Sequence, residues 1–109
     1  MIVTENHVSD ALDYLNIDPH PVALARKDCT DSENRRKECY ARAFLAAQGN
    51  IEERKAHAET DPACVVSKKE ESQDILQLER HRAKVRGAEM LIDCWRTEQS
   101  NIRAAEKIR

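Results

Sequence analysis

Cysteine and histidine are the residues of this chain that could support nucleophilic catalysis. Cys64 lies near Asp61 and His57, and this is the one place where a thiol has neighbours that could act as a general base. A thiol acts as a nucleophile when a base activates it. This grouping lies in a corner where a long predicted helix begins, so we expect Cys64 to be exposed. The sequence has no nucleophile elbow, no P-loop and no His-Glu-x-x-His motif. We therefore predict no catalytic residue and no enzymatic activity.

Potential metal ligands occur at spacings that match no common site. His57 with Cys64, and His81 with Glu89 and Cys94, form no zinc motif, and a closed zinc site requires four ligands. We expect neither a metal nor a cofactor.

The cysteines also indicate the environment of the protein. No C-x-x-C pair occurs, and no apolar signal sequence precedes them, because charged residues interrupt the start of the chain. We therefore expect free thiols in a reducing compartment, the cytoplasm, and three of them should act as small apolar residues on helix faces. These three are Cys29, Cys39 and Cys94. The sequence also lacks the run of about 18 apolar residues that a membrane span requires.

Basic side chains are most dense between Arg80 and Arg86. In a helix, Arg80 and Lys84 lie on one side of this segment and Arg82 and Arg86 on another. Two interpretations stay open: long basic side chains that cover an apolar seam, or salt-dependent contacts with nucleic-acid phosphates. The candidate nucleic-acid-binding residues are Arg80, Arg82, Lys84, Arg86, Arg96 and Arg103.

Charge is distributed unevenly, although the formal net charge is only −2. Residues 1–34 carry seven acids against two bases, a balance of −5, and residues 80–109 carry eight bases against four acids, a balance of +4. The two ends could attract each other in antiparallel helices, or the basic end could bind a polyanion.

Composition favours helices as the elements that position these residues. Charged residues make up 35% of the chain, and it has only two glycines and three prolines, which leaves little turn chemistry for a β fold. Apolar spacing and capping residues predict helices over about 5–15, 21–48, 51–59 and 62–105. Thr4, Asn50 and Asp61 are the expected N-caps, Glu53 would complete a capping box with Asn50, and Gly49 is the expected C-terminal cap.

Particular stretches refine this prediction. Val8, Leu12 and Leu15 should form the apolar stripe of the first helix. In the second helix the stripe weakens between Cys29 and Cys39, where charged residues crowd together, so this part should be solvated or meet a polar partner. The segment 18–21 contains two prolines and should form an elbow.

The lengths of the two long helices differ. At 1.5 Å per residue the last helix would span about 66 Å and the second only about 42 Å, so a hairpin leaves Ile92, Trp95 and Ile102 beyond the end of its partner. Trp95 with Arg96 could stack on an unpaired base, but a single Trp on a helical seam is more often core. We expect the first helix or a second chain to cover this interface, and we favour a homodimer.

Three segments together resemble a family of small helical proteins of tailed phages and prophages. They are ALDYL at 11–15, RAFLAAQGNIEERKA at 42–56, and IDCWRT at 92–97 followed by Asn101 and Arg103. Such proteins are often encoded near replication and recombination genes, so the resemblance implies a role in phage DNA metabolism. It implies no catalytic residue.

We therefore predict a single all-α domain over 1–109: an elongated antiparallel, coiled-coil-like hairpin with an N-terminal helix and a short corner helix. The predicted function is that of a non-catalytic accessory protein of DNA replication or recombination, whose partners are a phage or host protein and possible DNA. The alternatives are a structural coiled-coil dimer, and an inhibitor whose acidic N-terminal face occupies a host DNA-binding protein.

Overall fold

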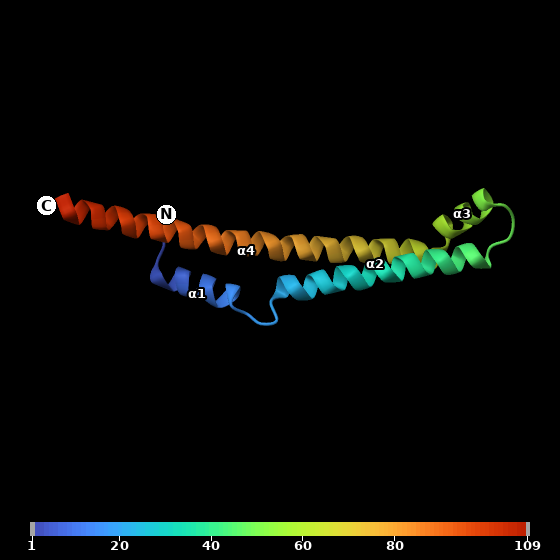
Figure 1. Ribbon diagram of the computed structural model, residues 1–109, viewed down its shortest axis with the longest axis horizontal. Coiled ribbons are helices and arrows are strands. Elements are labelled where there is room, and N and C mark those ends of the chain that lie inside the picture. Colours follow the sequence, from blue (N-terminus) through green and yellow to red (C-terminus); the bar gives the residue numbers. More distant parts are fainter. Residues whose placement is uncertain (1, 109) are drawn as a thin grey trace. The chain divides into compact units, whose positions relative to one another are not determined.

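Four helices contain 88% of the residues that the computed structural model describes, which are residues 2–108. They are α1 (Glu5–Leu15), α2 (Pro21–Ala46), α3 (Ile51–Thr60) and α4 (Pro62–Ile108) (Figure 1). No strand occurs among the described residues. The all-α prediction is confirmed, and every predicted helix is present within three residues of its expected bounds.

The chain divides into two compact units. One contains α1 and the part of α4 from Arg80 onward, and the other consists of residues 22–79. The single domain expected from chain length stays a prediction, which one cooperative unfolding transition would support.

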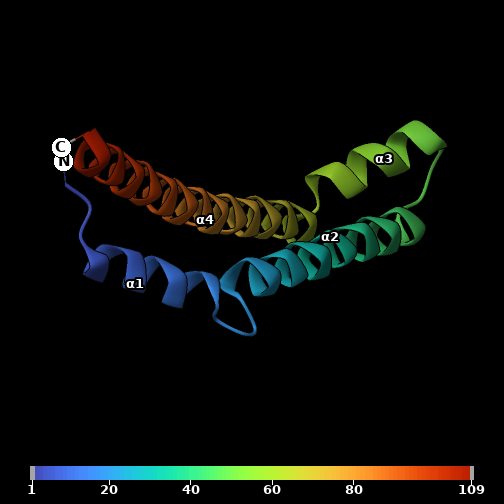
Figure 2. The same ribbon diagram turned by 60° about the vertical axis from the view of Figure 1, so that its left-hand side comes forward.

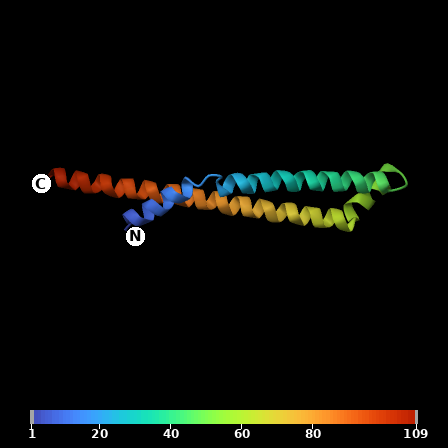
Figure 3. The same cartoon turned by 90° about the horizontal axis from the view of Figure 1, so that it is seen from below.

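The unit of residues 22–79 is an antiparallel hairpin. Here α2 runs beside the first part of α4, and α3 lies in the connection between them (Figures 1 and 3). Ion pairing and hydrogen bonding join residues far apart in sequence, with Arg36 opposite Glu71 and Ser32 opposite Asp74. The predicted hairpin is thus confirmed for this unit.

The middle of this hairpin is polar. Ser32 is only 1% exposed, and its hydroxyl donates a hydrogen bond to the Asp74 carboxylate. One turn along, Arg36 Nε donates to Glu71 Oε2 over 2.9 Å. A buried hydroxyl without a partner costs free energy, so these contacts favour one alignment of the two helices. The part of α2 in which the predicted apolar stripe weakens therefore packs against polar side chains of α4, one of the two outcomes expected from the sequence.

Small side chains form the apolar cluster at the closed end of the hairpin. Ala43 of α2, Ala58 of α3 and Cys64 of α4 are buried against one another, and Tyr40 and Phe44 pack on them. Because alanine and cysteine have short side chains, the three helices can approach closely here.

Backbone capping fixes the two turns of the corner. Gly49 has a φ of 109°, in the left-handed region that favours glycine. Asn50 Oδ1 then accepts a hydrogen bond of 2.9 Å from the Glu53 amide, and Asp61 Oδ1 accepts one of 2.9 Å from the Ala63 amide. Both predicted N-caps are confirmed, while α2 ends at Ala46, two residues earlier than expected.

The other unit is built by α1 packing on α4 (Figure 2). Val8 and Ala11 of α1 form a buried cluster with Val3 and Ile92. Two residues of the predicted stripe, Val8 and Leu15, pack here as expected, but Leu12 does not: it is 45% exposed, and the smaller Ala11 faces α4 instead. Leu15, Ala88, Leu91 and Trp95 pack around the cluster.

The predicted start and end of α1 are confirmed. Thr4 caps the helix by accepting from the His7 amide, and the His7 side chain accepts in return from the Thr4 amide. Between Leu15 and Pro21 the chain is irregular, as expected for a segment with two prolines. The Asp18–Pro19 peptide is cis.

Substitutions in the corner test these assignments. Gly49→Val places a β-branched side chain at positive φ and against the Glu53 carboxylate, so we expect a loss of about 1 kcal/mol or more in the free energy of unfolding. Asn50→Ala should cost about 1 kcal/mol through the lost cap. Chemical denaturation followed by circular dichroism measures both.

Gly87→Ala is the control for the corner. A Cβ at this position in α4 would meet nothing within 4 Å, so the substitution should stabilise the helix by about 0.5–1 kcal/mol. The corner assignment fails if Gly49→Val is as harmless as Gly87→Ala.

Candidate functional site

The apolar seam of α4 continues beyond the part that α1 covers. Ala88, Leu91, Ile92 and Trp95 pack in the cluster with α1, and Ile92 is buried there. In the next two turns the seam continues with Ile102, which is 51% exposed. The predicted interface residues thus separate: α1 covers Ile92 and part of Trp95, whereas Ile102 stays exposed.

Polar contacts lie at both ends of the segment of α4 that α1 covers. At one end the Tyr14 hydroxyl donates to the His81 carbonyl over 3.4 Å. At the other the Val3 amide donates to Glu98 Oε2 over 3.3 Å. All described residues from Ser100 to Ile108 are exposed. The end of α4 is therefore a helical surface that carries an apolar residue without cover from α1.

The six predicted basic residues do not form a single face. Lys84 Nζ lies 4.4 Å from the centre of the Tyr14 ring, and so contributes to the packing of α1. Arg96 lies 3.9 Å from Asp93, and Arg103 Nε donates to the Gln99 carbonyl over 3.4 Å. Three of the six basic side chains therefore already interact with other groups of this chain.

The remaining three cations lie in the segment 80–86. Arg80 and Arg86 are exposed, and neither has an ion pair among the described residues, while Arg82 is half-buried and has an interaction partner. Arg80 and Arg86 point to different sides of α4. A nucleic acid would therefore find two separate positive charges here, on different sides of α4, and no continuous basic surface.

Two sulfur atoms approach each other at the closed end of the hairpin. Cys39 Sγ of α2 lies 3.2 Å from Cys64 Sγ of α4, close enough for an S–H···S contact. The prediction that Cys64 is exposed was wrong: it is 2% exposed, because α3 and α2 pack over the first turn of α4. The prediction that Cys39 acts as a small apolar residue did not anticipate this thiol partner.

The surroundings of Cys64 keep its thiol protonated. Burial, the contact with Cys39 and the nearby Asp61 carboxylate together raise the pKa of Cys64 to about 11, and burial is the largest of these causes. Each of these effects disfavours the thiolate. At neutral pH the buried sulfur is therefore a poor nucleophile.

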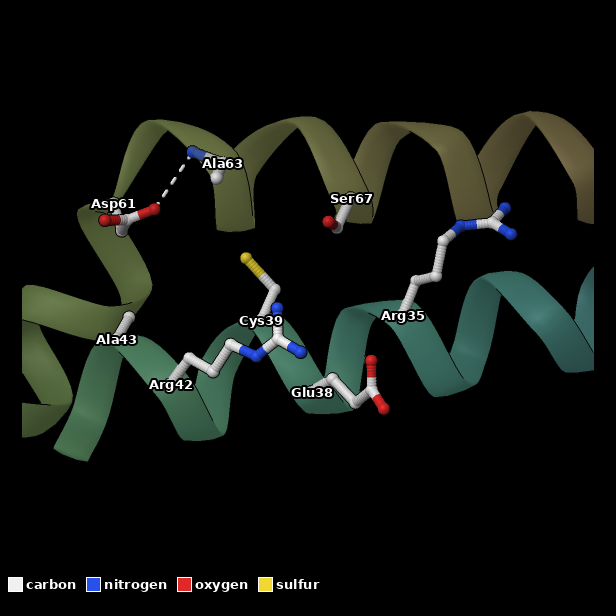
Figure 4. A pocket seen from close by; sticks show the side chains of 8 residues that line it. All are labelled: Arg35, Glu38, Cys39, Arg42, Ala43, Asp61, Ala63 and Ser67. Carbon is white, nitrogen blue, oxygen red and sulfur yellow. Dashed lines mark hydrogen bonds between the residues drawn. The ribbon is translucent and has the colours of Figure 1, made fainter. Parts of the chain in front are cut away.

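An open pocket of about 570 Å³ lies beside Cys39 (Figure 4). Cys39 lines it and Cys64 does not. Side chains of both charges surround it, and the lining residues are Arg35, Glu38, Cys39, Arg42, Ala43, Asp61, Ala63 and Ser67. The pocket gives a small molecule access to one of the two sulfurs.

The same cluster supplies an incomplete set of metal ligands. One ligand atom each from Cys39, Asp61 and Cys64 lies within 4.8 Å of the others. Asp61 Oδ1 already accepts hydrogen bonds from the amides of Ala63 and Cys64, as the N-cap of α4. A closed zinc site needs four ligands, so these three would leave one position for solvent.

Comparison with family models, curated proteins and solved structures gives no match to this chain. Within the described residues, no helix has the length and apolar character needed to cross a membrane.

The pKa of Cys64 predicts how it reacts with iodoacetamide, which alkylates thiolates. The alkylation rate at Cys64 should rise about tenfold per pH unit from pH 7 and level off near pH 11, because its thiolate fraction follows that pKa. Peptide mass spectrometry after timed alkylation measures the rate at each cysteine. Exposed Cys94 is the internal reference, and a Cys64 rate that levels off near pH 9 would contradict the assignment.

Proposed function

We propose that this chain is a non-catalytic accessory protein of phage-type DNA replication or recombination, which acts by binding a protein partner through the end of α4. The observation that carries the proposal is the apolar seam that α1 leaves uncovered after Glu98. The resemblance to phage proteins supports the DNA-metabolism context and a bacterial cytoplasmic location.

The exposed end of α4 offers the chemistry of a binding surface. Ile102 presents a large apolar side chain, and basic Arg103 and Lys107 accompany it on the same two turns. Helices gain most of their stability in proteins from packing of an apolar face, so a partner that covers Ile102 would stabilise this end. The matching surface would be apolar with acidic residues around it.

A second copy of the chain is the first partner to test. Symmetric dimers are the commonest oligomers, and two copies could pair the seams through Ile102. The cations at this end would repel their counterparts in the second copy, unless the acids Glu98 and Glu106 offset them. This homodimer is also the alternative function, a structural coiled-coil module.

Light scattering tests the dimer. We expect a dimer for the native chain, and Ile102→Asn should weaken dimerisation by about tenfold or more, since covering an isoleucine contributes about 1.5–3 kcal/mol. Leu45→Asn, at another exposed apolar residue (75% exposed), should leave the dimer intact. A monomeric native chain would direct the search to a different protein partner.

Trp95→Ala separates folding from association. Trp95 packs in the cluster of α1 and α4, so we expect this substitution to lower both the melting temperature and the dimer fraction, whereas Ile102→Asn lowers mainly the dimer fraction. Trp95 fluorescence should also be shielded from a soluble quencher. Full quenching of Trp95 would contradict its place in the cluster.

Salt-dependent binding tests contact with DNA. If Arg80 and Arg86 touch phosphates, the double variant Arg80→Gln/Arg86→Gln should reduce the slope of log affinity against log salt by about 2. Fluorescence anisotropy with a labelled duplex measures this slope. The control is Lys27→Gln/Lys37→Gln, which removes two exposed cations of α2 that pair with Asp31 and Glu33. An affinity that does not depend on salt would exclude phosphate contacts.

A further inference from the structure

The two sulfurs of Cys39 and Cys64 lie close enough for a disulfide to form after a small movement. Their separation is 3.2 Å, and an S–S bond measures about 2.05 Å, so each sulfur would move by about 0.6 Å. Both residues belong to the same compact unit.

Access to the two sulfurs is unequal. Cys39 is half-buried and lines the pocket, whereas Cys64 is buried behind it under α3. In Figure 4 the Cys39 sulfur lies between α2 and the beginning of α4. A molecule in the pocket would therefore meet Cys39 first, and Cys64 would be in position to act on the product.

The pocket has the size and charges to hold a small zwitterionic molecule. Its volume of about 570 Å³ is within the range of ligand sites, about 300–1,000 Å³. The cations Arg35 and Arg42 and the anions Glu38 and Asp61 line it together. A glutathione-type disulfide carries both carboxylates and ammonium groups, and so could find a partner for each.

We propose that Cys39 and Cys64 form a reversible disulfide by exchange with a small zwitterionic disulfide of the glutathione class, which enters the pocket beside Cys39. The Cys39 thiolate attacks one sulfur of that disulfide, whose S–S bond breaks and releases the first thiol. Cys64, once deprotonated, attacks Cys39 Sγ and displaces the second thiol. The two cysteines are oxidised, the small disulfide is reduced, and the two cysteine protons end on the two thiols released.

A metal ion fits the same cluster less well. Asp61 Oδ1 is occupied by the amides of Ala63 and Cys64, and the guanidinium groups of Arg35 and Arg42 in the lining oppose a cation. The cluster also supplies three ligands where a closed zinc site uses four. Two adjacent sulfurs are sufficient for a disulfide.

Oxidised glutathione is the probe for the experiment. The reduced full-length chain is incubated with it, quenched with acid, alkylated and mapped by mass spectrometry. We expect a Cys39–Cys64 crosslink and a chain lighter by two hydrogens, and excess dithiothreitol should reverse both. The oxidised chain should also unfold several degrees higher than the reduced one, because the bond closes the loop that contains α3.

Two variants, each lacking one sulfur of the pair, assign the roles of the sulfurs. Both are made with Cys29→Ser and Cys94→Ser, so that exposed Cys94 does not react, and circular dichroism checks that each retains its helices. Cys64→Ser should trap glutathione on Cys39, because no second thiol can displace it. Cys39→Ser should take up glutathione more than tenfold more slowly, because Cys64 is buried.

Several results would overturn the proposal. One is a native chain that couples Cys94 to another chain or to glutathione but never joins Cys39 to Cys64. A second is glutathione trapped on Cys64 rather than Cys39. A third is one equivalent of zinc, added as zinc chloride, that binds the cluster and blocks oxidation, which would make it a metal site. The mapping of the native chain decides the crosslink even if a variant fails to fold.

Discussion

The alignment of α2 on α4 is the constraint on which the unit of residues 22–79 depends. The chain has few large apolar side chains, and in the middle of the hairpin the helices meet through Ser32 and Asp74 and through Arg36 and Glu71. Sliding one helix by a turn would leave a buried hydroxyl and partly buried charges without partners. That cost is larger than the gain from any single contact, so the polar layer selects one alignment. The proximity of Cys39 to Cys64 follows from it.

Packing at the closed end then determines which sulfur a small molecule can reach. Alanine and cysteine let α2, α3 and α4 approach closely, and this close packing buries Cys64 while Cys39 remains at the edge of the pocket. Burial raises the pKa of Cys64, which keeps its thiol protonated at neutral pH. The contacts that stabilise the corner therefore also make one thiol of the pair, Cys39, more accessible than the other.

The unit of α1 and α4 presents a different kind of surface. Here α1 covers the seam of α4 from His81 to Glu98 and leaves Ile102 exposed. The candidate binding surface and the thiol pair lie in different compact units. Substitutions at Ile102 and at the cysteines should therefore have additive effects on stability, since the two sites share no contacts.

Local chemistry determined the helices of this protein from the sequence alone. Thr4, Asn50 and Asp61 cap helices, because capping depends on residues within a few positions of each other, and Gly49 adopts a positive φ in the turn that follows α2. Only the tertiary structure decided which face of each helix is buried and which distant residues meet. Ala11 replaced Leu12 at the α4 contact, and Cys64 met Cys39 across 25 residues. Spacing within one helix does not specify its rotation or its alignment against another, and these arise from packing and buried polar contacts between helices.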